Sequence, residues 1–433
     1  MKKTVLLLLT LLLCVQPLLG AVASEESYSG NLRFAYWGSQ RRAEITTEAI
    51  DMFLEQYPDL TIDSNIYDWE SYWDLMMTYA TGNELPDIIQ MDIHYLNTYV
   101  ANNLLMDLTP FIESGVLNVS DMSDGLLESG SIAGNPYAIC VGQNSVATIY
   151  NKTITDAAGI VIPDFMTVEE YKQVGRDVFE KLGIPTNYAY AKEGDYLEVF
   201  CRSAGYDLYT PDGEKFGMPD DSIFRAYFSD IESSVVEGYH IDPVVFVETN
   251  ATSPDTNPVV NGGTWNLLGH TNNLGQYAAA AIEGADLHLT AFPADNAKLG
   301  NYTKPAQFFC ITSGSKNPEA AAAFINFWTN SVEANEILLA ERGMPASNVV
   351  ALAIAPLLNI SQQRAAEMLV KIGENCSPIS PLAPLGATEI NTMINELTER
   401  ICYGDITGDA AGTYLFTEGN TLLQAAYESL QQQ

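Results

Sequence analysis

Short apolar runs alternate with longer segments of helical periodicity from residue 31 onward. Residues 31–36 form one apolar-rich run and residues 60–63 begin a second, a pattern that is typical of buried strands. Between the two runs, Ile45 and Phe53 mark apolar positions at helical spacing, and a second helical segment covers residues 71–80. Strand, helix, strand, helix and a further strand in this order predict a parallel, right-handed α/β sheet.

The stretch of residues 82–92 follows these helices and ends on polar side chains. Pro86 marks a turn, and Ile88 begins an apolar run short enough for a strand that is buried on both faces. In open α/β sheets ligands bind beyond the carboxyl ends of the strands, and Gln90 and Asp92 fall at this end. The alternative is that both side chains only cap the strand and meet solvent.

Farther along, single segments have clear signatures of their own. Thr167 and Glu170 form a capping box at the start of a helix. Residues 206–218 alternate around a turn as a small hairpin, and Pro318 stands in the first turn of a strong helix.

A chain of 433 residues exceeds one ordinary core, so we expect two lobes. The candidate crossings between them are the extended segments at residues 140–144, 306–309 and 344–346.

The N-terminus has the pattern of an export signal. Two lysines precede a largely apolar run at residues 5–13, and residues 21–23 (AVA) offer a small-residue cleavage site, so we expect a signal peptide at residues 1–23. Lipid attachment at Cys14 is disfavoured, because Leu13 is larger than the residue that a lipid-attachment motif requires. The sequence therefore predicts an exported protein, periplasmic or extracellular.

Composition excludes several classes of partner and scaffold. The chain has 20 Lys and Arg against 55 Asp and Glu, a net charge of −35, which repels phosphate backbones and argues against a nucleic-acid partner. The same acidity keeps an exported protein soluble. The five cysteines beyond the signal are too widely spaced for a disulfide scaffold or a metal site, so we expect buried thiols. They are Cys140, Cys201, Cys310, Cys376 and Cys402.

Motifs for catalysis and metal binding are missing from the sequence. The four histidines lack paired metal-ligand spacing, and no nucleophile elbow, P-loop or dinucleotide-binding glycine pattern is present. Residues 405–409 resemble the start of a calcium loop, but Ala410 and Phe416 stand where such a loop needs Gly and Glu. We therefore expect no metal, no cofactor and no catalytic residues.

Aromatic and amide side chains at predicted strand exits remain as candidates for chemistry. Flat aromatic faces stack on sugar C–H groups, while amides and carboxylates bond the hydroxyls. Core packing is the alternative for each, and we favour it for Trp73, which lies at helical spacing with Met76 and Met77. The set comprises Trp37, Trp69, Tyr72, Trp73, Tyr95, Asn144, Asn272 and Tyr302.

Five motifs in order resemble the family 1 extracellular solute-binding proteins of bacterial ABC sugar importers. They are residues 36–38 (YWG), 69–75 (WESYWDL), 82–92 (GNELPDIIQMD), 149–152 (IYNK) and 341–347 (ERGMPAS). The resemblance covers nearly the whole mature chain. It implies a two-lobed, periplasmic-binding-protein-like α/β fold with a hinge of three crossings. One lobe would comprise residues 30–141 plus 309–344, and the other residues 145–306 plus 346–433.

The resemblance also implies a function. A monomeric protein without enzymatic activity would hold an oligosaccharide or sugar derivative between its lobes and deliver it to the membrane permease subunits. Carried over by position, the ligand-binding residues are Trp37, Gln40, Arg42, Trp69, Gln90, Asp92, Tyr95, Asn144, His270, Asn272, Tyr302 and Lys304. Arg42 and Lys304 suit a carboxylate but Asp92 resists one, so we expect a neutral or weakly charged sugar. The alternatives are a secreted polysaccharide hydrolase or lyase and a carbohydrate-binding adhesin.

Overall fold

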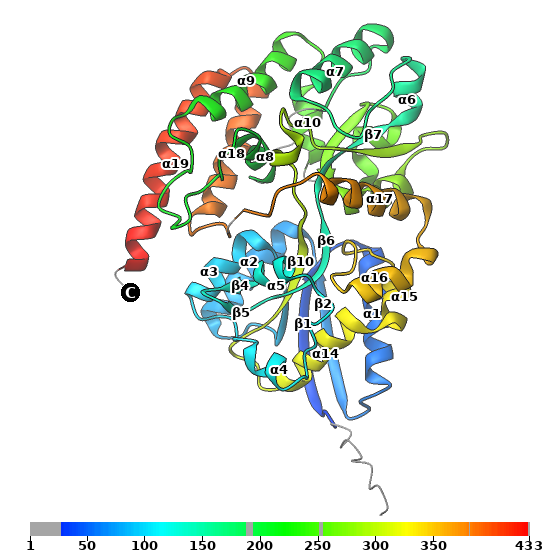
Figure 1. Cartoon of the computed structure of the whole chain (residues 1–433), viewed down its shortest axis with the longest axis vertical. Helices are drawn as coiled ribbons and strands as arrows, with labels where there is room; N and C mark the ends of the chain where they lie inside the picture. The colour runs from blue at the N-terminus through cyan, green and yellow to red at the C-terminus, as the bar shows by residue number, and fades with distance from the viewer. Residues whose placement is uncertain (1–26, 188–193, 251–253, 381, 432–433) are drawn as a thin grey trace, which may run out of the picture.

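A computed structural model describes residues 27–187, 194–250, 254–380 and 382–431. The predicted signal peptide and Cys14 lie outside this range. The chain folds into two α/β lobes, drawn one above the other in Figure 1, with β6 and β10 running between them. Two large apolar cores correspond to the two lobes: the first gathers around Phe34, Ile88 and Phe309, and the second around Tyr171, Phe224 and Ile390.

A five-stranded sheet forms the centre of the first lobe. Its order is β2-β1-β3-β10-β6, and β1, β2 and β3 are parallel, as the sequence predicts. The sheet as a whole is mixed, because β10 returns antiparallel to both β3 and β6. The strands are β1 (Gly30–Trp37), β2 (Leu60–Tyr67), β3 (Ile88–Met91), β6 (Ile139–Asn144) and β10 (Lys304–Ile311). A two-stranded ribbon of β4 (Ser131–Ile132) and β5 (Asn135–Pro136) lies apart from this sheet.

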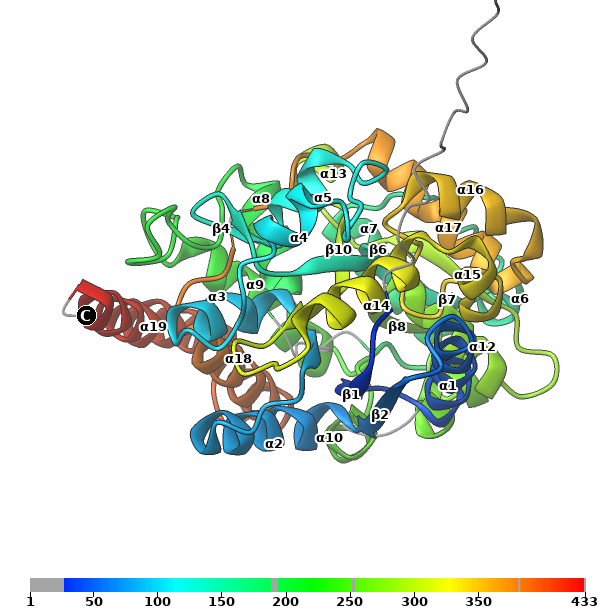
Figure 2. The ribbon, with the colours of Figure 1, turned by 90° about the horizontal axis from the view of Figure 1, so that it is seen from below.

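Side chains of β1 alternate between the two helical layers of this lobe. Phe34 packs edge-on against Phe324 of α14, with ring centroids 5.7 Å apart. The next residue, Ala35, lies on the other face, where its carbonyl accepts a bond from Tyr72 of α2. Figure 2 shows α14 and α1 beside the strands and α2 on the opposite side. Both faces are covered, which is why the strands read as nearly continuous apolar runs.

The helices of the first lobe follow the predicted pattern. Helices were expected around Ile45 and Phe53 and over residues 71–80, and α1 and α2 confirm both. Asn83, in the left-handed conformation, ends α2 just before β3. The helices are α1 (Gln40–Leu54), α2 (Trp69–Gly82), α3 (Ile93–Ala101), α4 (Thr109–Glu113), α5 (Asp124–Glu128), α14 (Pro318–Asn330) and α15 (Val332–Leu338).

The second lobe is built on a smaller, antiparallel sheet. Strand β7 (Val146–Asn151) lies between β8 (Asn266–His270) and β9 (Leu287–Ala291). Its helices, which include short 3-10 turns, are α6 (Lys152–Ala157), α7 (Val168–Leu182), α8 (Asp195–Ser203), α9 (Ser222–Val236), α10 (Pro243–Asn250), η1 (Pro254–Thr256), α11 (Pro258–Asn261), η2 (Thr271–Asn273), α12 (Leu274–Ala280), α13 (Ala297–Gly300), α17 (Ile360–Glu374), α18 (Ala387–Cys402) and α19 (Gly408–Gln431). Helix α16 (Asn348–Ile354), continued by η3 (Ala355–Leu357), packs instead against α14 and α15 of the first lobe.

Three chain crossings connect the lobes side by side. β6 continues into β7, β10 returns to the first sheet, and the turn after α15 leads back toward the second lobe. Gln143 and Met344 exchange backbone hydrogen bonds of 2.8 and 3.0 Å. A Cβ on Gly343 would lie 2.7 Å from the Gln143 carbonyl oxygen and 2.9 Å from the Ala306 Cβ. Glycine at 343 therefore lets the three predicted crossings pack against one another.

Several local predictions are confirmed. The Thr167 hydroxyl accepts from the Glu170 amide while the Glu170 carboxylate reaches back, a complete capping box. A single bridge between Tyr209 and Phe216 forms the predicted hairpin, which is smaller than two full strands. Four of the five cysteines are buried thiols, and Cys376 is partly exposed. Within the described ranges, no helix combines the length and the apolar character that crossing a membrane requires.

Candidate functional site

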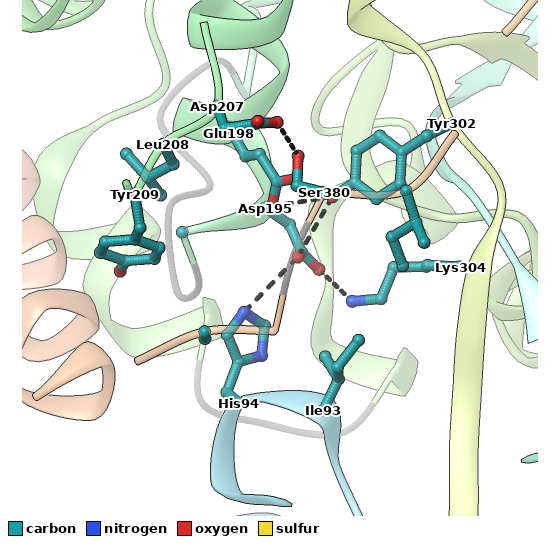
Figure 3. A pocket seen from close by; sticks show the side chains of 13 residues that line it. Ile93, His94, Asp195, Glu198, Asp207, Leu208, Tyr209, Tyr302, Lys304 and Ser380 are labelled. Atoms are coloured by element: carbon teal, nitrogen blue, oxygen red, sulfur yellow. Dashed lines mark hydrogen bonds and ion pairs between the residues drawn. The ribbon is translucent and has the colours of Figure 1, made fainter. Parts of the chain in front are cut away.

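A pocket opens between the two lobes, with an empty volume of about 530 Å³ when the solvent at its mouth is included. The N-terminus of α3 supplies its first-lobe wall, and α8, the hairpin, the start of β10 and the segment before α18 supply the rest (Figure 3). The lining residues are Ile93, His94, Gly194, Asp195, Glu198, Asp207, Leu208, Tyr209, Tyr302, Lys304, Ile379, Ser380 and Ala383.

On the first-lobe side, strand β3 positions a carboxylate and an imidazole. Asp92 follows the strand and caps α3, and its Oδ1 accepts from the His94 amide at 2.9 Å. The same oxygen lies 2.8 Å from His94 Nδ1. Asp92 and His94 are 7% and 9% exposed, so the alternative that the polar end of β3 meets solvent is wrong. The β3 exit therefore presents an oriented imidazole to the opposite lobe.

On the second-lobe side, Asp195 is the centre of a cluster of basic side chains. It is the first residue of α8, where the helix dipole favours a negative charge. Its Oδ2 lies 2.5 Å from Lys304 Nζ and 3.1 Å from His270 Nε2, and its Oδ1 lies 3.6 Å from His94 Nε2. The last contact bridges the lobes. Asp195 and Lys304 are only 1% and 3% exposed, so water screens their charges weakly.

A second carboxylate lies one helical turn beyond the first. The Tyr302 hydroxyl is 3.4 Å from both Asp195 Oδ1 and Glu198 Oε2. Arg202 lies over the Tyr302 ring, 4.5 Å from its centroid, and its Nη1 is 3.8 Å from Glu198. The aromatic ring is therefore held between a guanidinium behind it and two carboxylates at its hydroxyl.

Burial and neighbouring charges set the protonation of this cluster. Burial acts to raise the pKa of Asp195, but the charges of Lys304, His270 and His94 hold it well below its ordinary value. Burial acts to lower the pKa of His94, and its bond to Asp92 outweighs that and raises the pKa to about 9. At neutral pH, His94 is thus a cation between two ionised carboxylates. Burial, with the charge of Asp195 adding to it, raises the pKa of Glu198.

Comparison with known proteins places this architecture. Residues 48–357 match the family described as bacterial extracellular solute-binding proteins. The chain belongs to this family. A solved family 1 extracellular solute-binding protein from Alicyclobacillus acidocaldarius is 25% identical, with 92% of this chain and 100% of that chain covered and a TM-score of 0.68.

Two further relatives of this solute-binding protein carry carbohydrates in their names. A periplasmic oligogalacturonide-binding protein from Yersinia enterocolitica, solved with saturated digalacturonic acid, is 21% identical over 92% of this chain and 99% of that chain, with a TM-score of 0.79, and shows the fold alone. An arabinooligosaccharide-binding protein from Halalkalibacterium halodurans is 20% identical over 199 residues. That match spans 43% of each chain, less than half the length of the relative.

The predicted site residues of this solute-binding protein fall into separate groups. Tyr302 and Lys304 line the pocket, Asp92 bonds the pocket residue His94, and His270 bonds Asp195. The structure thus brings four of the predicted residues together around one cluster. Their contact with a ligand stays a prediction.

Three predicted aromatic residues pack in one cluster with Tyr72 and Trp73. Trp37 and Trp69 meet edge to face with centroids 5.0 Å apart, and Tyr95 stacks on Trp73 at 3.5 Å. Trp37 and Trp73 are 8% and 7% exposed, which agrees with core packing for Trp73. Trp69 and Tyr95 keep partial exposure. A sugar-stacking role for Trp37, Trp69 and Tyr95 stays a prediction, and only part of this cluster faces outward.

Other predicted residues have partners inside the first lobe. Gln90 is fully buried, and its side-chain oxygen accepts from Arg342 at 3.2 Å. Arg42 donates to Glu341 at 2.7 Å. Gln40 is exposed at the first position of α1. These three side chains lie outside the lining of the pocket described above, and their role toward a ligand stays a prediction.

The two predicted amides meet at the crossings. Asn144 donates to the Asn272 side-chain oxygen at 2.9 Å, across the junction of β6 and η2. Asn272 lines a second, smaller hollow together with Gln143 and Met344. This pair therefore lies nearer to the hinge than to the pocket, and its part in binding stays a prediction.

Sequence reasoning missed several residues of the pocket, above all His94, Asp195 and Glu198. His94 follows the predicted strand exit by two residues, and that spacing offered a signal. Asp195 and Glu198 are two of 55 acidic residues and had none. Among the residues that the structure describes, no group of three or more His, Cys, Asp or Glu side chains is arranged to hold a metal ion.

Proposed function

We propose that this protein is the substrate-binding component of an ABC importer, which captures a carbohydrate between its lobes and delivers it to the membrane permease subunits. The observation that carries the proposal is the polar pocket into which both lobes contribute side chains, His94 from one and Asp195 from the other. The family and the names of the two relatives support the class of ligand.

The chemistry of the pocket supports a sugar. Paired carboxylates, a lysine and tyrosine hydroxyls accept and donate the hydrogen bonds that sugar hydroxyls require. Ile93, Ile379 and Leu208 supply apolar surface for the C–H faces of a ring. Because a ligand that touches both lobes binds the closed form better than the open one, it shifts the protein toward closure.

We further propose the boundaries of the two lobes. The first comprises residues 30–141 plus 309–344, and the second residues 145–306 plus 346–433. The division of the two large apolar cores supports this, although Ala346 packs with the first core and α16 lies against α14 and α15 of the first lobe. The mature protein would begin after residue 23, act outside the cytoplasm as a monomer without a lipid anchor at Cys14, and bind no nucleic acid.

A thermal-shift panel tests the proposal. Purified protein is heated with neutral mono- to tetrasaccharides, digalacturonic acid, amino acids and inorganic phosphate. The proposal predicts that at least one sugar raises the melting temperature. Stabilisation by amino acids or phosphate alone would discard the carbohydrate assignment.

The proposed absence of enzymatic activity needs its own assay. The stabilising sugars are incubated with the protein, and the products are separated by chromatography. Intact sugars are expected. Cleavage at enzyme-like rates would favour the alternative of a polysaccharide-active hydrolase or lyase.

A further inference from the structure

Three basic side chains converge on a single carboxylate in the pocket. Lys304, His270 and His94 come from β10, β8 and α3, and their nitrogens lie 2.5, 3.1 and 3.6 Å from Asp195. Three converging basic groups in a buried, inter-lobe cavity make a site for an anion. In this chain, a carboxylate of the protein itself already occupies that place (Figure 3).

We propose that Asp195 determines the charge specificity of the site: it fills the anion position made by Lys304, His270 and His94, and so bars uronic-acid sugars while admitting uncharged ones. The inference rests on the proposed function, because it names the class of sugar that the same pocket accepts.

The geometry explains the exclusion. A uronate that reached Lys304 would have to displace Asp195 from a 2.5 Å ion pair. Its carboxylate would then lie against the ionised carboxylate of Asp195 in a poorly screened cavity. Glu198 and Asp207 line the same pocket, but the pKa of Glu198 is raised by burial and Asp207 is exposed to solvent, so the main repulsion comes from Asp195. A neutral sugar leaves the ion pairs intact, because its hydroxyls can donate hydrogen bonds to carboxylate oxygens without displacing the basic side chains.

Asp207 offers a control for the loss of a negative charge elsewhere in the pocket, at a position that is more exposed to solvent than Asp195. It lines the same pocket, and its Oδ1 accepts from the Ser380 hydroxyl at 2.8 Å instead of pairing with the three bases. Asp207→Asn therefore removes one negative charge from the pocket without vacating the anion position. Asp195→Ala also removes one negative charge, but in addition it vacates the anion position.

The experiment measures binding of digalacturonic acid and of neutral galactobiose, which differ in their carboxylates, by calorimetry. Wild type, Asp195→Ala, Asp195→Asn and Asp207→Asn are compared. We expect the dissociation constant for digalacturonic acid to fall at least tenfold in Asp195→Ala relative to wild type, and to stay within about threefold of wild type in Asp207→Asn. Asp195→Asn, which keeps the shape, should show a smaller gain.

The inference would be overturned if Asp195→Ala folds but gains no affinity for digalacturonic acid, or if Asp207→Asn gains as much. If Asp195→Ala does not fold, the comparison of the two sugars on the wild-type protein is the test. Wild type that binds digalacturonic acid more tightly than galactobiose would also contradict the inference. The proposed function fails on a different result: no carbohydrate of the thermal-shift panel stabilises wild type.

Discussion

His94 is held in its charged form by carboxylates from opposite lobes. Asp92 lies 2.8 Å from one ring nitrogen and Asp195 lies 3.6 Å from the other. Because burial alone would favour the neutral ring, the charged state depends on both partners. A buried imidazolium of this kind couples the stability of the closed pocket to pH.

Replacement of His94 by Gln should show that coupling. The pKa of His94 is raised from 6.5 to about 9, so its stabilising contribution is complete below pH 6.5 and is lost as the pH rises through 9. A shift of this size corresponds to about 3 kcal/mol. Urea denaturation at pH 6.5 and pH 9.5 measures it: the difference in unfolding free energy between wild type and His94→Gln should shrink at the higher pH. A difference independent of pH would contradict the assignment.

The residue scale also shows where sequence-based prediction ends. Asp92 was expected from the polar end of β3, Tyr302 and Lys304 were carried over by position from the family resemblance, and the structure gathers all three near one pocket. Asp195 was missed, because its importance comes from contacts with Lys304 and His94, which are distant in the sequence and which no local pattern reports. Gln90 was placed correctly at the end of β3, but its side chain turns inward to Arg342.

At the scale of elements, β3 joins the core of the first lobe to the pocket. Its Ile88 is fully buried between β1 and β10. Ile88→Asp places an unpaired charge there and should lower the unfolding free energy of the protein by about 4 kcal/mol or more. Thr61→Asp, on the exposed side of β2, is the control and should cost far less. Equal losses in chemical denaturation would show that the strand is not central.

The capping box of α7 gives a second prediction at this scale. Thr167→Ala removes the hydroxyl that accepts from the Glu170 amide at 3.2 Å and should cost about 1 kcal/mol. Thr47→Ala, in the exposed interior of α1, is the matched control and should be neutral or slightly stabilising, because alanine favours a helix. Urea unfolding curves compare the two. A Thr167→Ala protein as stable as wild type would contradict a role for this cap.

The elements themselves were largely predictable, for a physical reason. Apolar periodicity, capping residues and proline positions act over a few residues, so β1, α1, α7 and α14 follow from local sequence. The antiparallel course of β10 does not, because it depends on the return of a distant segment into the first sheet. The chain length predicted two lobes, and the resemblance to a family supplied their boundaries and the cleft between them.

On the scale of the whole molecule, the three crossings between the lobes pack against one another at Gly343. Gly343 has φ +97°, and a Cβ there would meet both neighbouring crossings at 2.7 and 2.9 Å. Gly343→Ala should therefore destabilise the protein and weaken sugar binding. Gly115→Ala carries similar backbone strain, at φ +81°, with no atom within 4 Å of the added Cβ. Thermal melts and sugar-binding assays on the two variants separate steric crowding at the crossings from backbone strain. Equal losses of stability and affinity in the two variants would argue against a packed hinge.

The most direct test of sugar binding between the lobes is a crystal structure with a sugar that raises the melting temperature. Electron density for the sugar is expected between the lobes, within hydrogen-bonding distance of His94 on α3 and of Asp195 or Lys304 on the other side. Density at the outer surface, or contacts confined to one lobe, would contradict it.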